Sequence, residues 1–175
     1  MRISTLLTAL VMLAALCGAP LAHAQTGGVS TQFRVTGEVQ HRIVFDLAKL
    51  EALPVTNENV WYFAGGSVVN SAFTGALLWD VLNTAGIVVD PNVKNDILRK
   101  VVIVIGSDSY QAVIAGGELV PQFGGEQIIV AYLQDGQLLG ADGFARLIVP
   151  GDKAGGRAVA NIVRIEVRDT DDLDN

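Results

Sequence analysis

The segment from Arg146 to Arg157 combines the residue types that proteins use to hold anions. An apolar run ends at Pro150, and the loop that follows holds three glycines and two cations, namely Gly151, Gly155, Gly156, Lys153 and Arg157. Glycines let backbone N–H groups approach an anion and form a concave nest. Arginine adds a bidentate fork, and lysine adds a point charge for phosphate. The spacing and the Lys-Ser/Thr end of a Walker loop are absent. The alternative interpretation is a mobile hairpin loop with solvated charges.

Nucleophilic catalysis has few residues to draw on. The single cysteine is Cys17, and the two histidines are His23 and His41. A hydrolase using Ser67 or Ser109 with His41 is a weak alternative, because neither serine lies in a nucleophile elbow. His41 lies in a polar, turn-like stretch, which is typical of a surface histidine.

Three carboxylates are candidates for acid–base work. Asp108 with Glu118, or Glu118 with Glu126, could form a pair. Nothing in their spacing forces them together, so we expect them to be exposed to solvent. Four aromatic residues are expected in the core, with a pocket wall as the alternative: Trp61, Tyr62, Phe63 and Trp79.

The first 24 residues have the pattern of a secretory leader. Arg2 precedes an apolar run, and Ala22-His23-Ala24 gives a small-x-small cleavage site before Gln25. The apolar run is short of the ~20 residues that span a bilayer, so no membrane span is expected after cleavage. A periplasmic or secreted protein is predicted. Cys17 and His23 leave with the leader, and the mature chain then has no thiol for a disulfide, a Cys-ligated metal or a nucleophile.

Charge excludes one class of partner. The formal net charge is −6, and four aspartates fall within the last seven residues. A mildly acidic body without a basic stripe argues against nucleic acid. We divide the chain into a signal peptide (1–24), a flexible lead-in (25–32), one domain (33–168) and a solvated, disordered acidic tail (169–175). A calcium site on the tail is the weaker alternative.

The elements that must position these residues are mostly strands. Short helices are expected over 47–53, after the N-cap Asp46, and around 77–82, where apolar residues recur at i, i+4. The run over 101–105 is β-branched and predicts a strand buried on both faces. Other strands are expected at 33–39, 43–45, 60–64, 68–69, 110–114, 127–133, 144–149 and 159–167. With seven to nine strands and two or three short helices, the fold class is α+β and rich in β.

The order of the motifs resembles the oxidoreductase molybdopterin-binding domain of the sulfite oxidase superfamily. The segments that carry the resemblance are Phe33-Arg-Val-Thr-Gly-Glu-Val39, Phe45 to Pro54, Phe73-Thr-Gly-Ala-Leu-Leu-Trp-Asp-Val-Leu82, Asp108-Ser-Tyr110, Asp135-Gly136, Arg146 to Asp152 and Ile165-Glu-Val167. It covers about residues 33–168. The resemblance implies a sulfite-oxidase-like fold with mixed sheets.

The resemblance also implies a molybdopterin-type cofactor and oxidoreductase chemistry. Active members supply a molybdenum-bound cysteine in the region that matches Val60 to Val69, where this chain has no cysteine. A serine such as Ser67 cannot replace a thiolate, because its pKa and softness differ greatly. The family's Lys-Trp pair falls near Ala160-Asn161 here. The positions that remain to face an anionic pterin are Arg146, Gly151, Lys153, Gly155, Gly156 and Arg157.

Two functions follow. One is a periplasmic domain that binds a molybdopterin-type or other phosphorylated ligand through residues 146–157, with redox chemistry open. The other is a non-catalytic module that kept the fold, lost molybdenum chemistry, and binds a small anionic ligand or an envelope protein partner.

Overall fold

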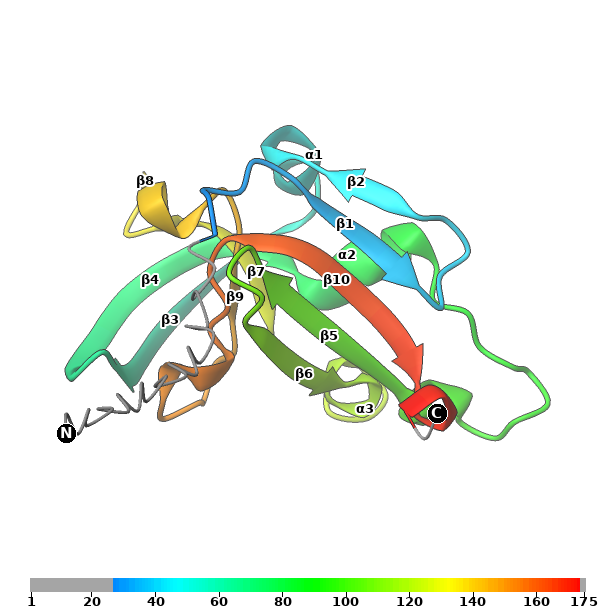
Figure 1. Cartoon of the computed structure of the whole chain (residues 1–175). Helices are drawn as coiled ribbons and strands as arrows, with labels where there is room; N and C mark the ends of the chain where they lie inside the picture. Colours follow the sequence, from blue (N-terminus) through cyan, green and yellow to red (C-terminus); the bar gives the residue numbers. More distant parts are fainter. Residues whose placement is uncertain (1–26, 174–175) are drawn as a thin grey trace, which may run out of the picture.

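The computed structural model describes residues 27–173, and the predicted leader lies outside this part of the chain. Within residues 27–173, ten strands form two five-stranded sheets, with short helices between them (Figure 1). The strands are β1 (Phe33–Gly37), β2 (Ile43–Phe45), β3 (Val55–Ala64), β4 (Ser67–Leu77), β5 (Lys100–Gly106), β6 (Gln111–Ala115), β7 (Ile129–Gln134), β8 (Gln137–Leu138), β9 (Arg146–Ile148) and β10 (Ile162–Asp169). The helices are α1 (Leu47–Glu51), α2 (Leu78–Ala85) and α3 (Gly116–Leu119), with 3-10 turns η1 (Asp96–Arg99), η2 (Gly140–Asp142), η3 (Gly155–Arg157) and η4 (Thr170–Leu173).

The first sheet has the order β2-β1-β10-β5-β6. It joins the two ends of the domain, because β1 pairs in parallel with β10. Its other pairs are antiparallel, so the sheet is mixed, as expected from the resemblance. Strand β5 is buried along nearly its whole length, which confirms the strand predicted from the β-branched run.

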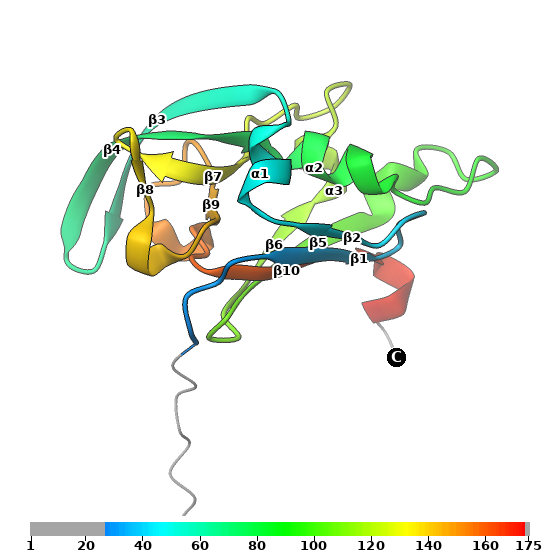
Figure 2. The same cartoon turned by 90° about the horizontal axis from the view of Figure 1, so that it is seen from above.

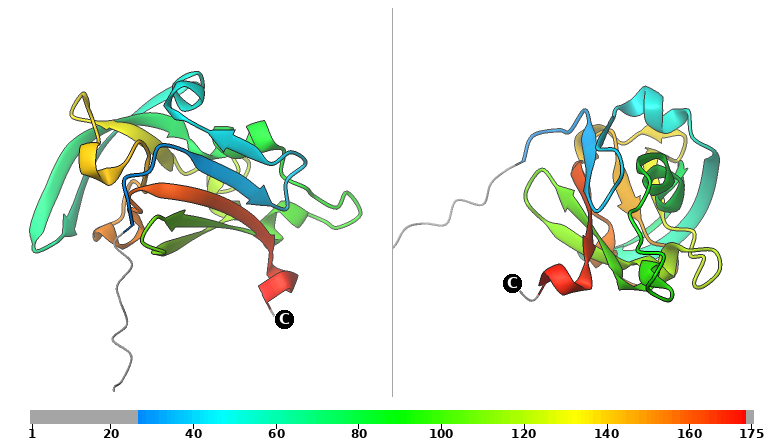
Figure 3. Two further views of the ribbon diagram at one scale, coloured as in Figure 1. Left: turned by 45° about the horizontal axis from the view of Figure 1, so that its top comes forward. Right: turned by 90° about the vertical axis from the view of Figure 1, so that its right-hand side faces the viewer.

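The second sheet is antiparallel and has the order β3-β4-β7-β8, with β9 also paired to β7. Strands β3 and β4 form a long, curved hairpin that reaches beyond the rest of the domain (Figures 1 and 3). Strand β3 is the edge of this sheet. The turn predicted at Asp135-Gly136 closes the hairpin of β7 and β8, and this additional two-residue strand takes the total to ten.

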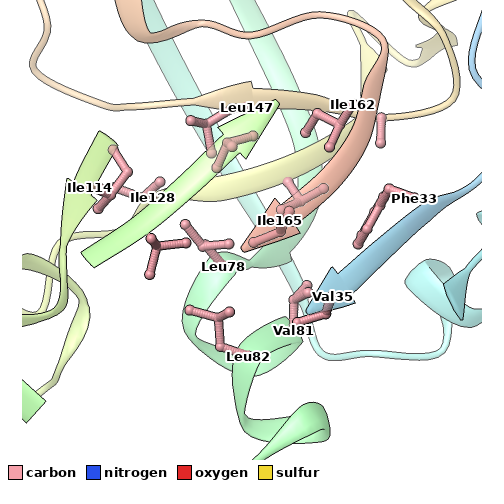
Figure 4. Close-up of a cluster of buried hydrophobic side chains, with 14 of the residues drawn as sticks. Phe33, Val35, Leu78, Val81, Leu82, Ile114, Ile128, Leu147, Ile162 and Ile165 are labelled. Atoms are coloured by element: carbon pink, nitrogen blue, oxygen red, sulfur yellow. The ribbon is translucent and has the colours of Figure 1, made fainter. Parts of the chain in front are cut away.

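The main core lies between the two sheets (Figure 2). Helix α2 contributes Leu78, Val81 and Leu82, all of them fully buried. These side chains belong to the same core as residues of the first sheet, such as Val35 and Ile165 (Figure 4). The i, i+4 spacing that predicted this helix is therefore the spacing of its buried face.

A second, smaller core covers the opposite face of the second sheet. Along β7, Val130 belongs to the main core and Ile129 to the second, because successive side chains of a strand point to opposite faces. Tyr62 from β3 and Phe73 from β4 complete it. Ala158 packs against this cluster, so the chain that follows β9 forms its cover.

The acidic tail differs from the expected disordered end, since residues 169–173 are described as the end of β10 and the turn η4. Lys100 is almost fully buried, and its Nζ lies 2.7 Å from Asp169 and 3.3 Å from Asp96. Arg99 lies 3.1 Å from Asp169 and also pairs with Asp171. The prediction was wrong because two cations from β5 and η1 bind the first tail carboxylates.

Acid is expected to weaken the protein through this cluster. Hydrogen bonds from the Lys100 ammonium and then the Asp171 N–H lower the pKa of Asp169 from 3.8 to about 2. A depressed carboxyl pKa contributes stability that is present above pH 3.8 and is lost as the pH falls towards 2. Asp169→Asn should flatten the fall in unfolding free energy across this window, as measured by urea denaturation. Identical pH profiles for the two proteins would contradict the assignment.

Candidate functional site

The loop after β9 leaves its sheet and reaches the edge strand β3. The Lys153 carbonyl oxygen accepts a hydrogen bond of 2.9 Å from the Phe63 N–H. Ala154 forms a parallel bridge with Phe63, so the two segments lie side by side (Figure 1). The loop therefore differs from a free hairpin, because the edge of the second sheet holds its tip.

Two of the three loop glycines, Gly155 and Gly156, contact aromatic side chains. A Cβ atom added at Gly155 would lie 2.8 Å from Cε2 of Tyr62, which leaves no room for any side chain. The carbonyl oxygen of Gly156 accepts a 2.6 Å hydrogen bond from the Tyr110 hydroxyl. Gly151 has a φ of +87° and open space around its Cα. Close packing on Tyr62 thus explains Gly155 without an anion.

Arg157 is bound by carboxylates of this same chain. Its Nε and Nη2 donate to the two Asp152 carboxylate oxygens at 3.0 and 2.7 Å, and Nη1 lies 3.4 Å from Glu118. The hydrogen bond to Asp152 raises the pKa of the guanidinium, and the charges of Asp152 and Glu118 raise it further. A bidentate pair of this kind uses the same fork that would hold a phosphate.

The two other predicted cations differ from each other. Arg146 pairs with Asp142, and its Nε is buried with no hydrogen-bond partner in the described part of the chain. Lys153 is exposed, and within residues 27–173 it forms no ion pair. Of the predicted positions, the structure brings Gly151 and Arg157 to one cavity and leaves Lys153 on the other side of the loop.

That cavity has a volume of about 300 Å³. Glu118 and Glu126 both line it, and the Glu126 N–H donates to the Glu118 carbonyl at 2.8 Å. Glu126 is exposed to solvent, as expected, and Glu118 is half-buried. Asp108 is bound elsewhere, to the N–H of Tyr110. Two carboxylates therefore bind the one guanidinium, and a third acid, Glu126, lines the same cavity, so an added anion would meet net repulsion. The lining residues are Glu118, Glu126, Ile128, Val149, Pro150, Gly151, Asp152 and Arg157.

A second cleft, of about 320 Å³, lies between β3 and the same loop. Its lining is Asn59, Val60, Trp61, Gly151, Asp152 and Lys153. Trp61 is 63% exposed and Phe63 is 55% exposed, so the expectation that both lie in the core was wrong. Trp61 instead lines this cleft, as the pocket-wall alternative predicts. Tyr62 between them is buried. Alternation along 60–64 could have shown that Trp61 and Phe63 share one face and that Tyr62 points to the other.

The remaining candidates do not form a catalytic set. His41 is exposed, as expected, in the connection between β1 and β2, whereas Ser67 begins β4 in the other sheet. Across residues 27–173, no group of three or more His, Cys, Asp or Glu side chains could hold a metal ion. In the same part of the chain, no helix is long and apolar enough to cross a membrane.

Comparison with known proteins places these features in a family. Residues 23–174 match the oxidoreductase molybdopterin binding domain. The chain belongs to that family. The match confirms the resemblance drawn from the order of the motifs.

The fold of this family member is similar to that of solved structures. The crystal structure of the sulfane dehydrogenase SoxCD from Paracoccus pantotrophus matches with a TM-score of 0.65 and 20% sequence identity. The match covers 79% of this chain and 38% of the SoxCD chain. The family member described here thus spans well under half of that relative. Among curated proteins, none matches.

A molybdopterin-type cofactor places two requirements on the site of a family member. Such a cofactor carries an anionic phosphate and binds molybdenum, for which a soft thiolate is the natural protein ligand. The sole cysteine of the sequence is Cys17, and Arg157 is already neutralised by Asp152 and Glu118. The residues present in the acidic cavity do not fit the group.

Proposed function

We propose that this protein is a non-catalytic binding module that has kept the molybdopterin-binding fold and lost molybdenum chemistry. The observation that carries the proposal is the state of Arg157, whose guanidinium is held at 2.7 and 3.0 Å by Asp152 and at 3.4 Å by Glu118. The Arg157 guanidinium, which lines the cavity of about 300 Å³, is therefore already bound by carboxylates of its own chain. A phosphate would have to displace a bidentate carboxylate to reach it.

Secretion is part of the proposal. The leader pattern over residues 1–24 supports export, with cleavage before Gln25. The mature chain then has no cysteine, and its stability in an oxidising compartment comes from packing. The two clusters of buried residues supply that packing.

A second candidate is a protein that binds a molybdopterin-type or other phosphorylated ligand through residues 146–157. Family membership over residues 23–174 favours it, as does the exposed ammonium of Lys153 at the tip of the loop. Here the ligand would displace Asp152 from Arg157 and open the loop.

The cofactor content of the purified full chain separates the two candidates. In a host that makes the molybdenum cofactor, the binding-module proposal expects neither molybdenum nor pterin fluorescence to copurify. Pterin at a level comparable to the protein would favour the second candidate.

A further inference from the structure

The edge strand β3 presents unpaired backbone groups. Because the Phe63 N–H donates to Lys153, the N–H and C=O of Phe63 point away from β4. Backbone direction alternates along an antiparallel strand, so Val55, Asn57, Asn59 and Trp61 also direct their N–H and C=O groups outward. Among residues 27–173, none of these four N–H groups has a hydrogen-bond partner across the open edge.

This edge lacks the usual protection against a further strand. Natural edges carry lysine, proline or a bulge, but residues 55–61 contain no lysine or proline, and their register with β4 is unbroken. The one charged side chain of this stretch, Glu58, is half-buried on the inner face, where burial raises its pKa. Val55 and Trp61, at the two ends of the stretch, are 58% and 63% exposed.

The two ends of this edge have different surroundings. Near Val55, no strand among residues 27–173 pairs with the outer edge of β3. At the Trp61 end the loop comes alongside, and Asn59 to Trp61 face Gly151 to Lys153 across a cleft of about 320 Å³. The Asp152 carboxylate of this cleft is engaged by Arg157, whereas the ammonium of Lys153 is unpaired among the described residues.

We propose that β3 and residues 151–153 form a peptide-binding groove for the free C-terminus of a partner protein. The partner's last residues extend the sheet beyond β3, and their terminal carboxylate meets the Lys153 ammonium at the Trp61 end. Because β3 runs from Val55 towards that end, the guest strand runs parallel to it. An antiparallel guest would bring a terminal ammonium against Lys153. The inference rests on the proposed function, whose binding partner it names.

Selection of peptides with free C-termini tests the groove. The probe is a library of random heptapeptides displayed at the C-terminus of a carrier, followed by synthesis of the selected peptide as free acid and as amide. The full chain should select peptides, and the acid should bind about tenfold more tightly than the amide, because a hydrogen bond to a charged group is lost. No selection, or equal binding of acid and amide, would overturn the proposal.

Two variants locate the interaction. Lys153→Gln should bring the acid and the amide form of the peptide to equal affinity, while Lys94→Gln, at another exposed lysine, should keep the tenfold difference.

Asn59→Pro tests the pairing with β3. It removes an outward N–H and leaves the hydrogen bonds to β4 intact, so it should abolish binding of both forms of the peptide. If Asn59→Pro does not fold, the Lys153→Gln result decides. If the Lys153→Gln variant still binds the acid more tightly than the amide, the proposed role of Lys153 in the groove is wrong. Cofactor content is measured separately, so failure here is distinct from failure of the proposed function.

Discussion

Phe33→Ala is expected to lower the free energy of unfolding by about 3–5 kcal/mol, the usual cost of removing a buried aromatic ring. Phe33 is fully buried in the main core. Its ring stacks on Phe45 and Phe144, with centroids 5.2 and 5.6 Å away. Those two rings belong to β2 and to the segment before β9, so the cavity would open where the two sheets meet.

Urea denaturation followed by fluorescence measures this loss. Val44→Ala on β2 is the matched control, since Val44 is 40% exposed and opposes the residue after Phe33. A surface substitution of this kind should cost about 0.5 kcal/mol or less. Equal losses for the two variants would mean that the ring does not join the sheets.

Gly155→Ala is expected to destabilise the protein by about 1–3 kcal/mol, as overpacking does in a filled core. The added Cβ would lie 2.8 and 3.0 Å from two ring carbons of Tyr62 and 3.1 Å from Cβ of Ala64. Tyr62 is buried in the second core and has little room to move. The loop has to lift away from β3 instead.

Gly156→Ala provides the control at the next residue, because its Cβ would meet nothing nearer than the Tyr110 hydroxyl at 4.0 Å. Limited proteolysis of the loop, together with urea denaturation, distinguishes the two. Gly155→Ala should be cleaved faster between residues 149 and 158, and Gly156→Ala should resemble the unmodified chain. Faster cleavage of Gly156→Ala than of Gly155→Ala would mean that the loop does not pack on Tyr62.

Local patterns in the sequence are sufficient for much of the fold. The β-branched run over 101–105 predicted β5, and the i, i+4 spacing of apolar residues such as Leu78 and Leu82 predicted α2. Strand β3 was predicted too short, because its first half contains polar residues such as Asn57 and Asn59 that alternate with half-buried ones. An edge strand buries little surface, so its apolar signal is weak.

Pairings between distant residues could not be predicted. Arg157 meets Glu118 from 39 positions away, and Lys100 meets Asp169 from 69 positions away. Both depend on how the sheets and loops meet, which no local pattern encodes. The glycine-rich loop indicated an anion site, whereas its arginine is bound by Glu118 and by Asp152, which lies only five positions away. The direction of the Asp152 side chain is likewise set by how the loop folds onto β3. The exposed position of Trp61 was missed for the same reason, since the edge of a sheet is a property of its topology.

The molybdenum content of the full chain tests the loss of molybdenum chemistry most directly. The protein is purified from a host that synthesises the cofactor, alongside a family member that binds molybdenum as the positive control. Elemental analysis and the fluorescence of oxidised pterin are measured on both. We predict that molybdenum and pterin stay at background in this protein and approach one per chain in the control. Molybdenum near one per chain in this protein would contradict the proposal.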